Sequence, residues 1–303
     1  MKKVIASLFA IFCLMAPVFA AGSKDSGHYV TISGKQISLP KKIERIISLS
    51  PSNTEILDGL GVSKKIIAVD TYSRIPEGVS TDIPKFDIMN PNTEQLIALA
   101  PDVILTTGMA EVKGTDPYQP CRNAGITVIS IPTASTIDEI IESITMLGTI
   151  TKTTSNATKL NKKITTAISN IKSVVARIPE AERKTVYFEV SPAPYLYTTG
   201  YGTYAHEMFE ICGLINVFGD IEAWKPISNE QVLAKNPDFI FTTTDFLPDP
   251  IQEIASRKGW AVIAAVKNNS IYQIENRVIS QPCQNIIEGL EYISKTVYPK
   301  YFK

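Results

Sequence analysis

Two glutamates in a repeated phrase are the first residues of this chain whose types and spacing suggest chemistry. Glu94 lies in TEQLIALAPDVILTTG (93–108) and Glu230 in NEQVLAKNPDFIFTTT (229–244), an offset of 136 residues (230 − 94), and eight of the 16 paired positions are identical. Two carboxyl groups about 5–9.5 Å apart would serve as the acid and base of a glycoside hydrolase. A phrase repeated at a constant offset instead predicts two copies of one structural unit, with the glutamates far apart at equivalent, outward positions.

Other catalytic or metal chemistry finds little support in the sequence. No GxSxG, Walker or GxGxxG motif is present in a suitable context. Two histidines, His28 and His206, are too few for a zinc or manganese site, and no CxxC pair occurs. A thiol–imidazole pair of His206 with Cys121, Cys212 or Cys283 is disfavoured because His206 lies on a predicted helix. We therefore expect no enzyme, no catalytic residue, no metal ligand and no resident cofactor.

The N-terminus has the pattern of a secretory signal peptide. Lys2 and Lys3 precede an apolar run that ends in the small-x-small sequence Val18-Phe19-Ala20, which predicts cleavage after Ala20. The run is shorter than the ~20 residues that a membrane-spanning helix needs. We expect a periplasmic or otherwise extracytoplasmic protein, and Cys13 leaves open a lipid anchor at its start.

Three cysteines remain after this cleavage. In an oxidising compartment one disulfide and one free thiol are the natural arrangement. Cys212 and Cys283 both lie in the second half of the chain, so they are the predicted pair, with Cys121 free. Three buried free thiols are the alternative.

Composition and hydrophobic patterning predict the architecture. The 303 residues are 44% hydrophobic and suffice for two domains, while 30 basic and 30 acidic residues leave no field that would attract nucleic acid. Strand-like runs alternate with helical ones, from a hairpin around Ser33-Gly34 to a last helix near residues 285–298. In RIISLSPSNTEILDGLGV, Ser52 and Glu55 fit a capping box at a helix start.

The segment 153–178 differs from both halves. Its apolar positions are spaced 3, 4, 4, 3 and 4 residues apart, which predicts one long amphipathic helix: Ala157, Leu160, Ile164, Ile168, Ile171 and Val175. The predicted division is a signal peptide (1–20), an N-terminal lobe (21–152), a linker helix (153–178) and a C-terminal lobe (179–303). The fold class is α/β: two similar parallel-sheet lobes, joined by the helix, with a ligand cleft between them.

Three runs carry a resemblance to a known family: RIISLSPSNTEILDGLGVSKKIIAVDTYS, MNPNTEQLIALAPDVILTTG and GLINVFGDIEAWKPISNEQVLAKNPDFIF. They resemble ABC-importer substrate-binding proteins with a rigid helical linker, a family of cobalamin-, ferric siderophore- and haem-binding proteins. The cobalamin-binding members are the most similar, and the resemblance spans nearly all of the chain after the signal peptide. It implies that Glu94 and Glu230 dock onto the two subunits of a permease dimer, once per lobe.

The resemblance also implies a set of ligand contacts. Tyr72 and Trp224 match aromatic walls of the cleft, Phe86 lies near another such wall, and a tyrosine-rich stretch, PYLYTTGYGTY, falls at the cleft. The implied ligand-binding residues are Tyr72, Phe86, Tyr197, Tyr201 and Trp224, with Ser52 and Asn53 offering polar groups at a helix start. SQPCQN stands where many relatives have an arginine, and Thr107 replaces an aromatic residue.

The resulting prediction is a monomeric binding protein that captures a small-molecule metal chelate, cobalamin or a related corrinoid, and delivers it to an ABC permease. A ferric siderophore or haem receptor of the same fold is the alternative, and a two-carboxylate glycoside hydrolase is a weaker one. A receptor that feeds a sensor also stays open. The linker helix lacks Pro and Gly, so little lobe movement is expected on ligand binding.

Overall fold

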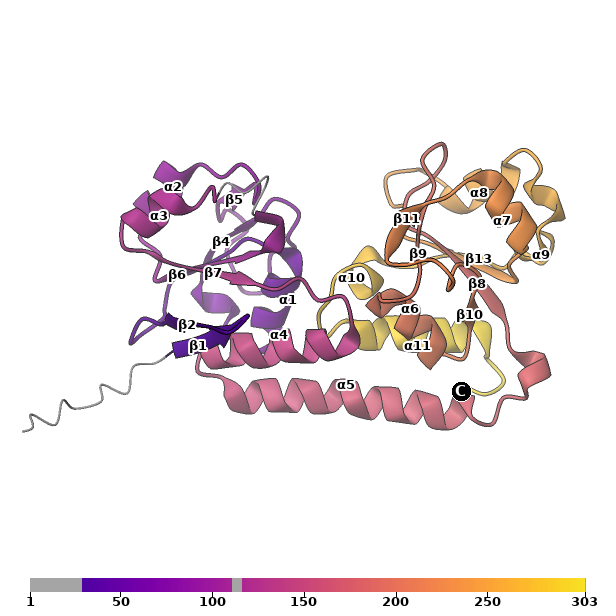
Figure 1. Cartoon of the computed structure of the whole chain (residues 1–303), viewed down its shortest axis with the longest axis horizontal. Coiled ribbons are helices and arrows are strands. Elements are labelled where there is room, and N and C mark those ends of the chain that lie inside the picture. Colours follow the sequence, from indigo (N-terminus) through magenta and orange to yellow (C-terminus); the bar gives the residue numbers. More distant parts are fainter. Residues whose placement is uncertain (1–28, 111–115, 303) are drawn as a thin grey trace, which may run out of the picture.

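The computed structural model describes residues 29–110 and 116–302. The predicted signal peptide, Cys13 and His28 lie outside these residues. The chain forms two α/β lobes that stand side by side on a base of long helices, with a gap between them (Figure 1). The predicted fold class, two parallel-sheet lobes joined by one long helix, is confirmed.

The N-terminal lobe is built on a five-stranded parallel sheet of order β5-β4-β3-β6-β7. Its strands are β3 (Ile46–Ser48), β4 (Ile66–Asp70), β5 (Lys85–Phe86), β6 (Val103–Thr107) and β7 (Thr127–Ile131). Its helices are α1 (Pro51–Gly59), α2 (Thr93–Ala98), α3 (Gln119–Asn123) and α4 (Ile137–Ile150). The predicted hairpin at Ser33-Gly34 joins β1 (Tyr29–Ile32) to β2 (Lys35–Ser38).

The C-terminal lobe has a four-stranded parallel sheet of order β10-β8-β12-β13 and a separate antiparallel pair, β11-β9. The strands are β8 (Thr185–Glu189), β9 (Tyr197–Thr199), β10 (Ile215–Asn216), β11 (Trp224–Pro226), β12 (Phe239–Thr242) and β13 (Ile271–Gln273). The helices are α6 (Tyr204–Ile211), α7 (Asn229–Lys235), α8 (Pro250–Ser256), α9 (Ala264–Lys267), α10 (Asn276–Ile279) and α11 (Ile286–Val297).

The linker is a single helix, α5 (Thr154–Val175), and it buries the apolar stripe that its sequence predicts. It does not stand alone, because α4 and α11 both pack along it (Figure 1). The α4–α5 contact is tight at Gly148, where an added Cβ would lie 2.5 Å from the Cβ of Ala157. Helix α4 was not predicted from the sequence. The two lobes therefore share a base of three packed helices.

The repeated phrase forms the same helix–strand unit in each lobe, α2–β6 and α7–β12. Asn92 caps α2 through a hydrogen bond from the Gln95 amide (3.1 Å), and Ser228 with Gln231 forms a capping box on α7. The predicted capping box of α1 is wrong. Ser50 is the N-cap of that helix, and the carboxylate of Glu55 is buried in other contacts.

The predicted Cys212–Cys283 disulfide is also wrong. Cys121, Cys212 and Cys283 are all free, buried thiols. Cys212 ends α6 and turns its Sγ toward α11, where the thiol donates to Leu290 O (3.4 Å) and lies 3.2 Å from Ser294 Oγ. Burial raises the pKa of both predicted partners to about 12. These thiols pack as small apolar groups and are poor nucleophiles.

Among the residues that the structure describes, no helix combines the length and the apolar character needed to cross a membrane.

Candidate ligand site between the lobes

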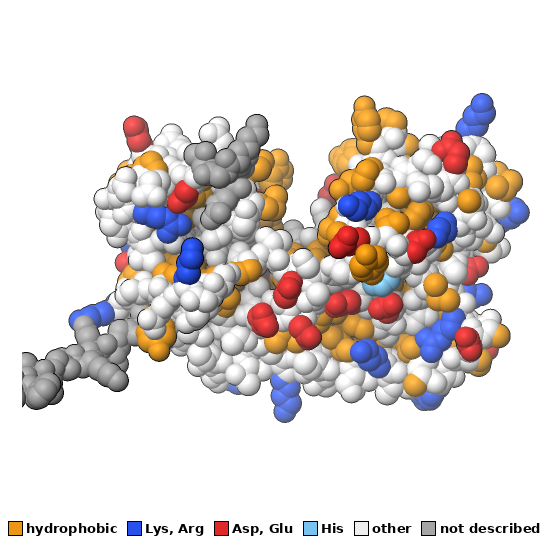
Figure 2. Space-filling model, viewed as in Figure 1, with side chains coloured by type: hydrophobic (Ala, Val, Ile, Leu, Met, Phe, Trp, Pro, Cys, Tyr) orange, Lys and Arg blue, Asp and Glu red, His pale blue; other side chains and the backbone are white. Residues whose placement is uncertain are grey.

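A cavity of about 390 Å³ lies between the lobes. Figure 2 shows the hollow between them, with hydrophobic side chains on both of its walls. The N-terminal lobe contributes Ser50, Pro51, Ser52, Asn53, Ile56, Thr107, Met109, Pro132, Thr133, Ala134, Ser135 and Ser143. The C-terminal lobe contributes Tyr204, Trp224, Ser280, Gln281 and Pro282.

The fold explains why these residues meet. Strands β3, β6 and β7 are parallel neighbours, so their carboxyl ends reach the same edge of the sheet. Chain segments 50–53, 107–109 and 132–135 directly follow those ends and form one wall. This is the edge at which open α/β sheets bind ligands.

An aromatic pair forms part of the opposite wall. The rings of Trp224 and Tyr204 meet edge to face, with centroids 6.2 Å apart. Trp224 begins β11, which pairs with β9. The segments that flank these two strands approach so closely that a Cβ at Gly200, just after β9, would overlap Ile221 O, just before β11. The hydroxyl of Tyr197 donates to Trp224 O (3.2 Å), so it supports the backbone of this wall.

The cavity carries no charged side chain among its described lining residues. Its polar groups are hydroxyls and carboxamides, and some of them already have partners. Ser50 and Ser52 share a hydrogen bond of 2.9 Å, and Asn53 donates to Thr106 O (3.2 Å). Ser280 Oγ and Gln281 Oε1 are buried without a hydrogen-bond partner among the described residues. Since native proteins pair most buried polar atoms, these two groups are candidates for contact with a ligand or with water.

The sequence-predicted contacts fall into three groups. Ser52, Asn53 and Trp224 line the cavity. Tyr197, Tyr72 and Tyr201 do not line it. Tyr197 supports the backbone of Trp224, while the rings of Tyr72 and Tyr201 are exposed near strand ends, with 86% and 48% of their surface accessible.

Phe86 requires a correction. It is only 6% exposed and packs in the core of the N-terminal lobe, among residues that include Leu96 and Tyr118. Its ring is buried because β5, the edge strand, pairs with β4 and exposes Lys85 while it turns Phe86 inward. Phe86 is a core residue and does not form a wall of the cavity.

Several lining residues were not singled out as ligand contacts. Tyr204 belongs to the tyrosine-rich stretch that the resemblance assigns to the cleft, in which Tyr197 and Tyr201 are the implied contacts. Ser280 and Gln281 lie in the segment noted only for its missing arginine. Met109 lies two residues after Thr107, which ends β6. Its position just after a strand of the repeated phrase was the sequence signal that could have identified it as a lining residue.

Glu94 and Glu230 are both exposed, each in the first turn of its helix. Helices α2 and α7 lie on the sides of the two lobes that face away from α5 (Figure 1). Hydrogen bonds from its own backbone N–H and from the Ser228 hydroxyl hold the pKa of Glu230 below its usual value. Neither glutamate lines the cavity between the lobes.

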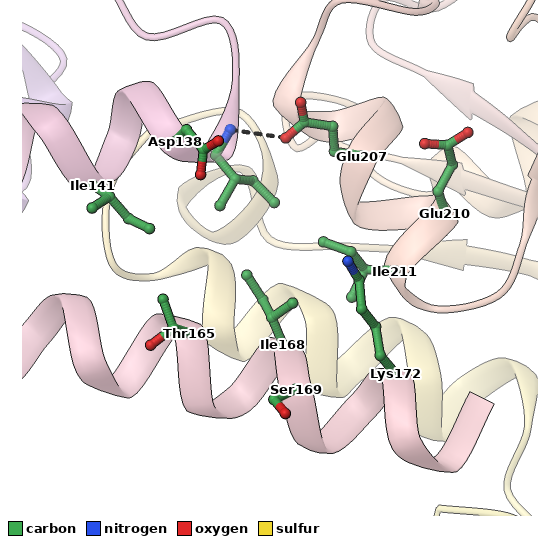
Figure 3. A pocket seen from close by; sticks show the side chains of 10 residues that line it. Asp138, Ile141, Thr165, Ile168, Ser169, Lys172, Glu207, Glu210 and Ile211 are labelled. Carbon is green, nitrogen blue, oxygen red and sulfur yellow. Dashed lines mark hydrogen bonds between the residues drawn. The ribbon is translucent and has the colours of Figure 1, made fainter. Parts of the chain in front are cut away.

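A second cavity, of about 630 Å³, lies where α4, α5 and α6 meet (Figure 3). Its side chains include Asp138, Glu207 and Glu210, and Glu207 Oε2 accepts a hydrogen bond from Ile137 N (2.9 Å) across the two lobes. Burial raises the pKa of Glu207, and the charges of Asp138 and Glu210 add to this rise. The smaller cavity is the candidate ligand site, because strand ends and aromatic residues form it.

Two α/β lobes on a shared helical base, with a cavity between them, define a two-lobe binding protein. No group of three or more His, Cys, Asp and Glu side chains placed to hold a metal ion occurs within residues 29–110 and 116–302. The chain belongs to the periplasmic binding protein family, whose sequence model matches positions 46–278.

Individual relatives support this membership. An uncharacterized ABC transporter substrate-binding lipoprotein of Bacillus subtilis, YvrC, is 32% identical over 271 residues, which cover 89% of this chain and 85% of the relative. A vitamin B12-binding protein of Vibrio cholerae is 26% identical over 272 residues, covering 88% and 93%. A crystal structure from Staphylococcus epidermidis, described as a possible iron-binding (periplasmic solute-binding) protein, has a TM-score of 0.74 and 33% identity, covering 85% of this chain and 100% of that one.

Proposed function

We propose that this protein is the extracytoplasmic substrate-binding component of an ABC importer, and that its ligand is a large, uncharged metal chelate, namely cobalamin or a related corrinoid. The observation that carries the proposal is the cavity between the lobes, which combines an aromatic wall with hydroxyl and carboxamide groups and no charged side chain among its described lining residues.

Exposed hydrophobic side chains that follow the carboxyl ends of strands support a large ligand. Tyr72 follows β4, Met109 follows β6 and Phe246 follows β12, and their exposed fractions are 86%, 60% and 71%. Tyr201 follows β9 and is also exposed. Large apolar groups exposed together on a soluble protein commonly mark a binding surface. A planar ligand that stacks on such rings gains ~0.5–1.5 kcal/mol of binding free energy per aromatic pair, in addition to the free energy of burying its apolar surface.

The uncharged wall favours a corrinoid over an anionic chelate. A corrinoid presents a planar macrocycle edged with carboxamides, which pair with hydroxyl and amide groups without any protein charge. An anionic ferric siderophore or the propionates of haem would leave a buried charge without a cationic partner, which is costly. The similarity to a vitamin B12-binding protein points the same way.

A ferric siderophore or haem receptor is the second candidate, favoured by the similarity to a possible iron-binding protein. Iron ligation would need a phenolate or imidazole inside the cleft. Tyr204 is the tyrosine that lines the cavity, and burial raises the pKa of its phenol well above 10. This phenol is a poor source of phenolate.

Delivery to a permease rests on Glu94 and Glu230. Each presents an exposed carboxylate on the same structural unit of its lobe, an arrangement that suits basic pockets on a two-fold symmetric partner. The predicted signal peptide and the relative named as a lipoprotein support an extracytoplasmic location. We propose that the protein acts as a monomer, with lipid attachment through Cys13 as the alternative to free release. A receptor that signals to a sensor would use the same cleft.

The test is a ligand panel on the purified protein: cyanocobalamin, dicyanocobinamide, haemin, a neutral ferric hydroxamate and an anionic ferric catecholate. Visible absorbance and thermal unfolding report binding, since a ligand at 100 times its Kd adds about 2.7 kcal/mol to the stability of the folded state. We expect both corrinoids to raise the melting temperature. Binding of haemin or a ferric chelate alone would replace the corrinoid proposal with the second candidate.

A further inference from the structure

The loop between α10 and α11 both lines the ligand cleft and holds the other lobe. Ser280, Gln281 and Pro282 face the cavity, while Gln284 and Asn285 donate hydrogen bonds to Glu55 on α1. Helix α1 itself begins with the serines of the opposite wall. The two walls of the cleft are thus joined here through one short segment of each lobe, in addition to the Ile137–Glu207 hydrogen bond described above.

Glu55 is the centre of this junction. It is only 3% exposed, and its carboxylate is shared between the lobes. Arg74 of the N-terminal lobe donates to both carboxylate oxygens, at 2.8 and 3.0 Å, and Asn285 Nδ2 of the C-terminal lobe donates to Oε2 at 2.9 Å. The backbone oxygen of Glu55 accepts a further hydrogen bond from Gln284 Nε2 at 2.7 Å.

The local packing leaves little freedom for this contact. A Cβ added at Gly59 of α1 would lie 3.0 Å from Gln284 Nε2 and 3.1 Å from Leu160 Cδ1 of the linker helix. Asn285 is 7% exposed and immediately precedes α11, which packs along α5. Arg74 lies two residues after Tyr72, so the same cluster reaches the loop that carries this exposed aromatic ring.

We propose that Glu55 and Asn285 form a positioning contact that holds the two walls of the ligand cleft at a fixed separation and orientation. The proposal takes the cleft to be the ligand site, as proposed above. Neither residue is itself a ligand contact: Glu55 and Asn285 do not line the cavity. Their effect on the ligand is indirect, because a preorganised site loses less freedom on binding.

The chemistry of the contact explains why these residue types are needed. A buried carboxylate is tolerated only where donors surround it, and here they come from both lobes. Separation of the lobes at this point would leave the buried Glu55 carboxylate short of its Asn285 donor. The free-energy cost of a buried Glu55 carboxylate that lacks one of its donors opposes movement of one wall relative to the other.

The experiment measures the separation of the lobes directly. Spin labels at Asn123→Cys on α3 and Lys267→Cys on α9, both exposed positions in different lobes, report a distance distribution by double electron–electron resonance without any ligand. A sample without these introduced cysteines corrects for label taken up by native thiols. The test variants are Asn285→Ala and Asn285→Asp, the second of which faces Glu55 with another carboxylate.

Asp58→Asn is the matched control. It removes the other carboxylate partner of Arg74, at 3.1 Å, and leaves the contact between the lobes intact. We expect a narrow distribution in the wild type and in Asp58→Asn, and a distribution about twice as wide in Asn285→Ala. Cyanocobalamin affinity should fall about tenfold in Asn285→Ala and stay unchanged in Asp58→Asn.

The milder Asn285→Ala variant keeps the test decisive if Asn285→Asp fails to fold. Distance distributions that match the wild type in the folded Asn285 variants would overturn the proposal. Broadening without loss of cyanocobalamin affinity would overturn the positioning role. Failure of the wild type to bind cyanocobalamin would count against the corrinoid function alone, because the distances are measured without ligand.

Discussion

Asp102 and Asp238, at equivalent positions of the repeated phrase, make the same contact in the two lobes. Asp102 Oδ2 accepts the backbone N–H of Arg45 (2.8 Å) just before β3, and Asp238 Oδ2 accepts the backbone N–H of Thr185 (2.9 Å) at the start of β8. Each aspartate thus ties the turn after its helix to the neighbouring parallel strand. The repeat therefore preserves a structural unit as well as the glutamate that precedes it.

Replacing either aspartate with alanine should destabilise the fold by a similar amount. Loss of the acceptor leaves a backbone N–H at a strand start without its partner, at a cost of about 1–3 kcal/mol. The sites lie in separate lobes, so the effects of Asp102→Ala and Asp238→Ala should add to within about 0.5 kcal/mol. Urea denaturation of both single variants and the double variant checks this. Strongly unequal single effects would show that the two units are not equivalent.

The raised pKa of Glu207 predicts a specific pH dependence. The pKa of Glu207 is higher in the folded state than in the unfolded state. Between these two pKa values the native state therefore binds more protons than the unfolded state, so the free energy of unfolding falls as the pH rises through this range. Glu207→Gln keeps an acceptor for Ile137 N and removes this fall. At pH 7 the variant should melt up to about 4 °C higher than the wild type, and the two should converge near pH 4.

Thermal unfolding across this pH range, with Glu142→Gln on the exposed surface of α4 as the control, makes the measurement. A Glu207→Gln variant that is less stable at neutral pH would show that the charge of Glu207 stabilises the native state. Burial and the charges of Asp138 and Glu210 would then not disfavour the ionised Glu207 carboxylate in the native state.

Gln281 should influence which ligand charge the cleft accepts. Gln281→Arg places a cation in the cavity wall, which has none among its described lining residues. The affinity for an anionic ferric catecholate should therefore rise about tenfold, and the affinity for cyanocobalamin should fall about tenfold. Gln252→Arg, on exposed α8 outside the cavity, controls for net charge. Equal effects of the two arginines would remove Gln281 from the site.

The docking glutamates should affect transport and leave ligand binding unchanged. Glu94→Lys and Glu230→Lys each reverse a charge at an exposed helix start, and each should lower uptake through the cognate permease by about tenfold or more. Glu291→Lys, an exposed site on α11, is the control. Full uptake with both glutamates reversed would exclude their role in docking.

The sequence predicted the lobes, the linker helix and the repeated units because each depends on local periodicity and turn chemistry. The 3–4 spacing from Ala157 to Val175 fixes the buried face of α5 without knowledge of its partners. The duplicated phrase similarly identified α2–β6 and α7–β12 before their sheets were known.

The errors arose where tertiary contacts decide the outcome. Glu55 satisfies the spacing of a capping box, yet its carboxylate pairs with Arg74 and with Asn285, which is 230 residues further along the chain. Cys212 and Cys283 share one half of the chain, but the Cys212 thiol points at α11. Phe86 and Trp224 look alike as aromatic candidates, and only the fold separates a core ring from a cavity wall.

The most direct test of the account is the affinity of cyanocobalamin for the wild type and for Trp224→Ala, measured by isothermal titration calorimetry. Tyr29→Ala, which removes an exposed aromatic ring on β1 outside the cavity, is the matched control. We expect the wild type and Tyr29→Ala to bind equally well and Trp224→Ala to bind at least tenfold more weakly, about the loss expected for a buried aromatic contact. Equal binding by all three proteins would contradict the placement of the ligand between the lobes.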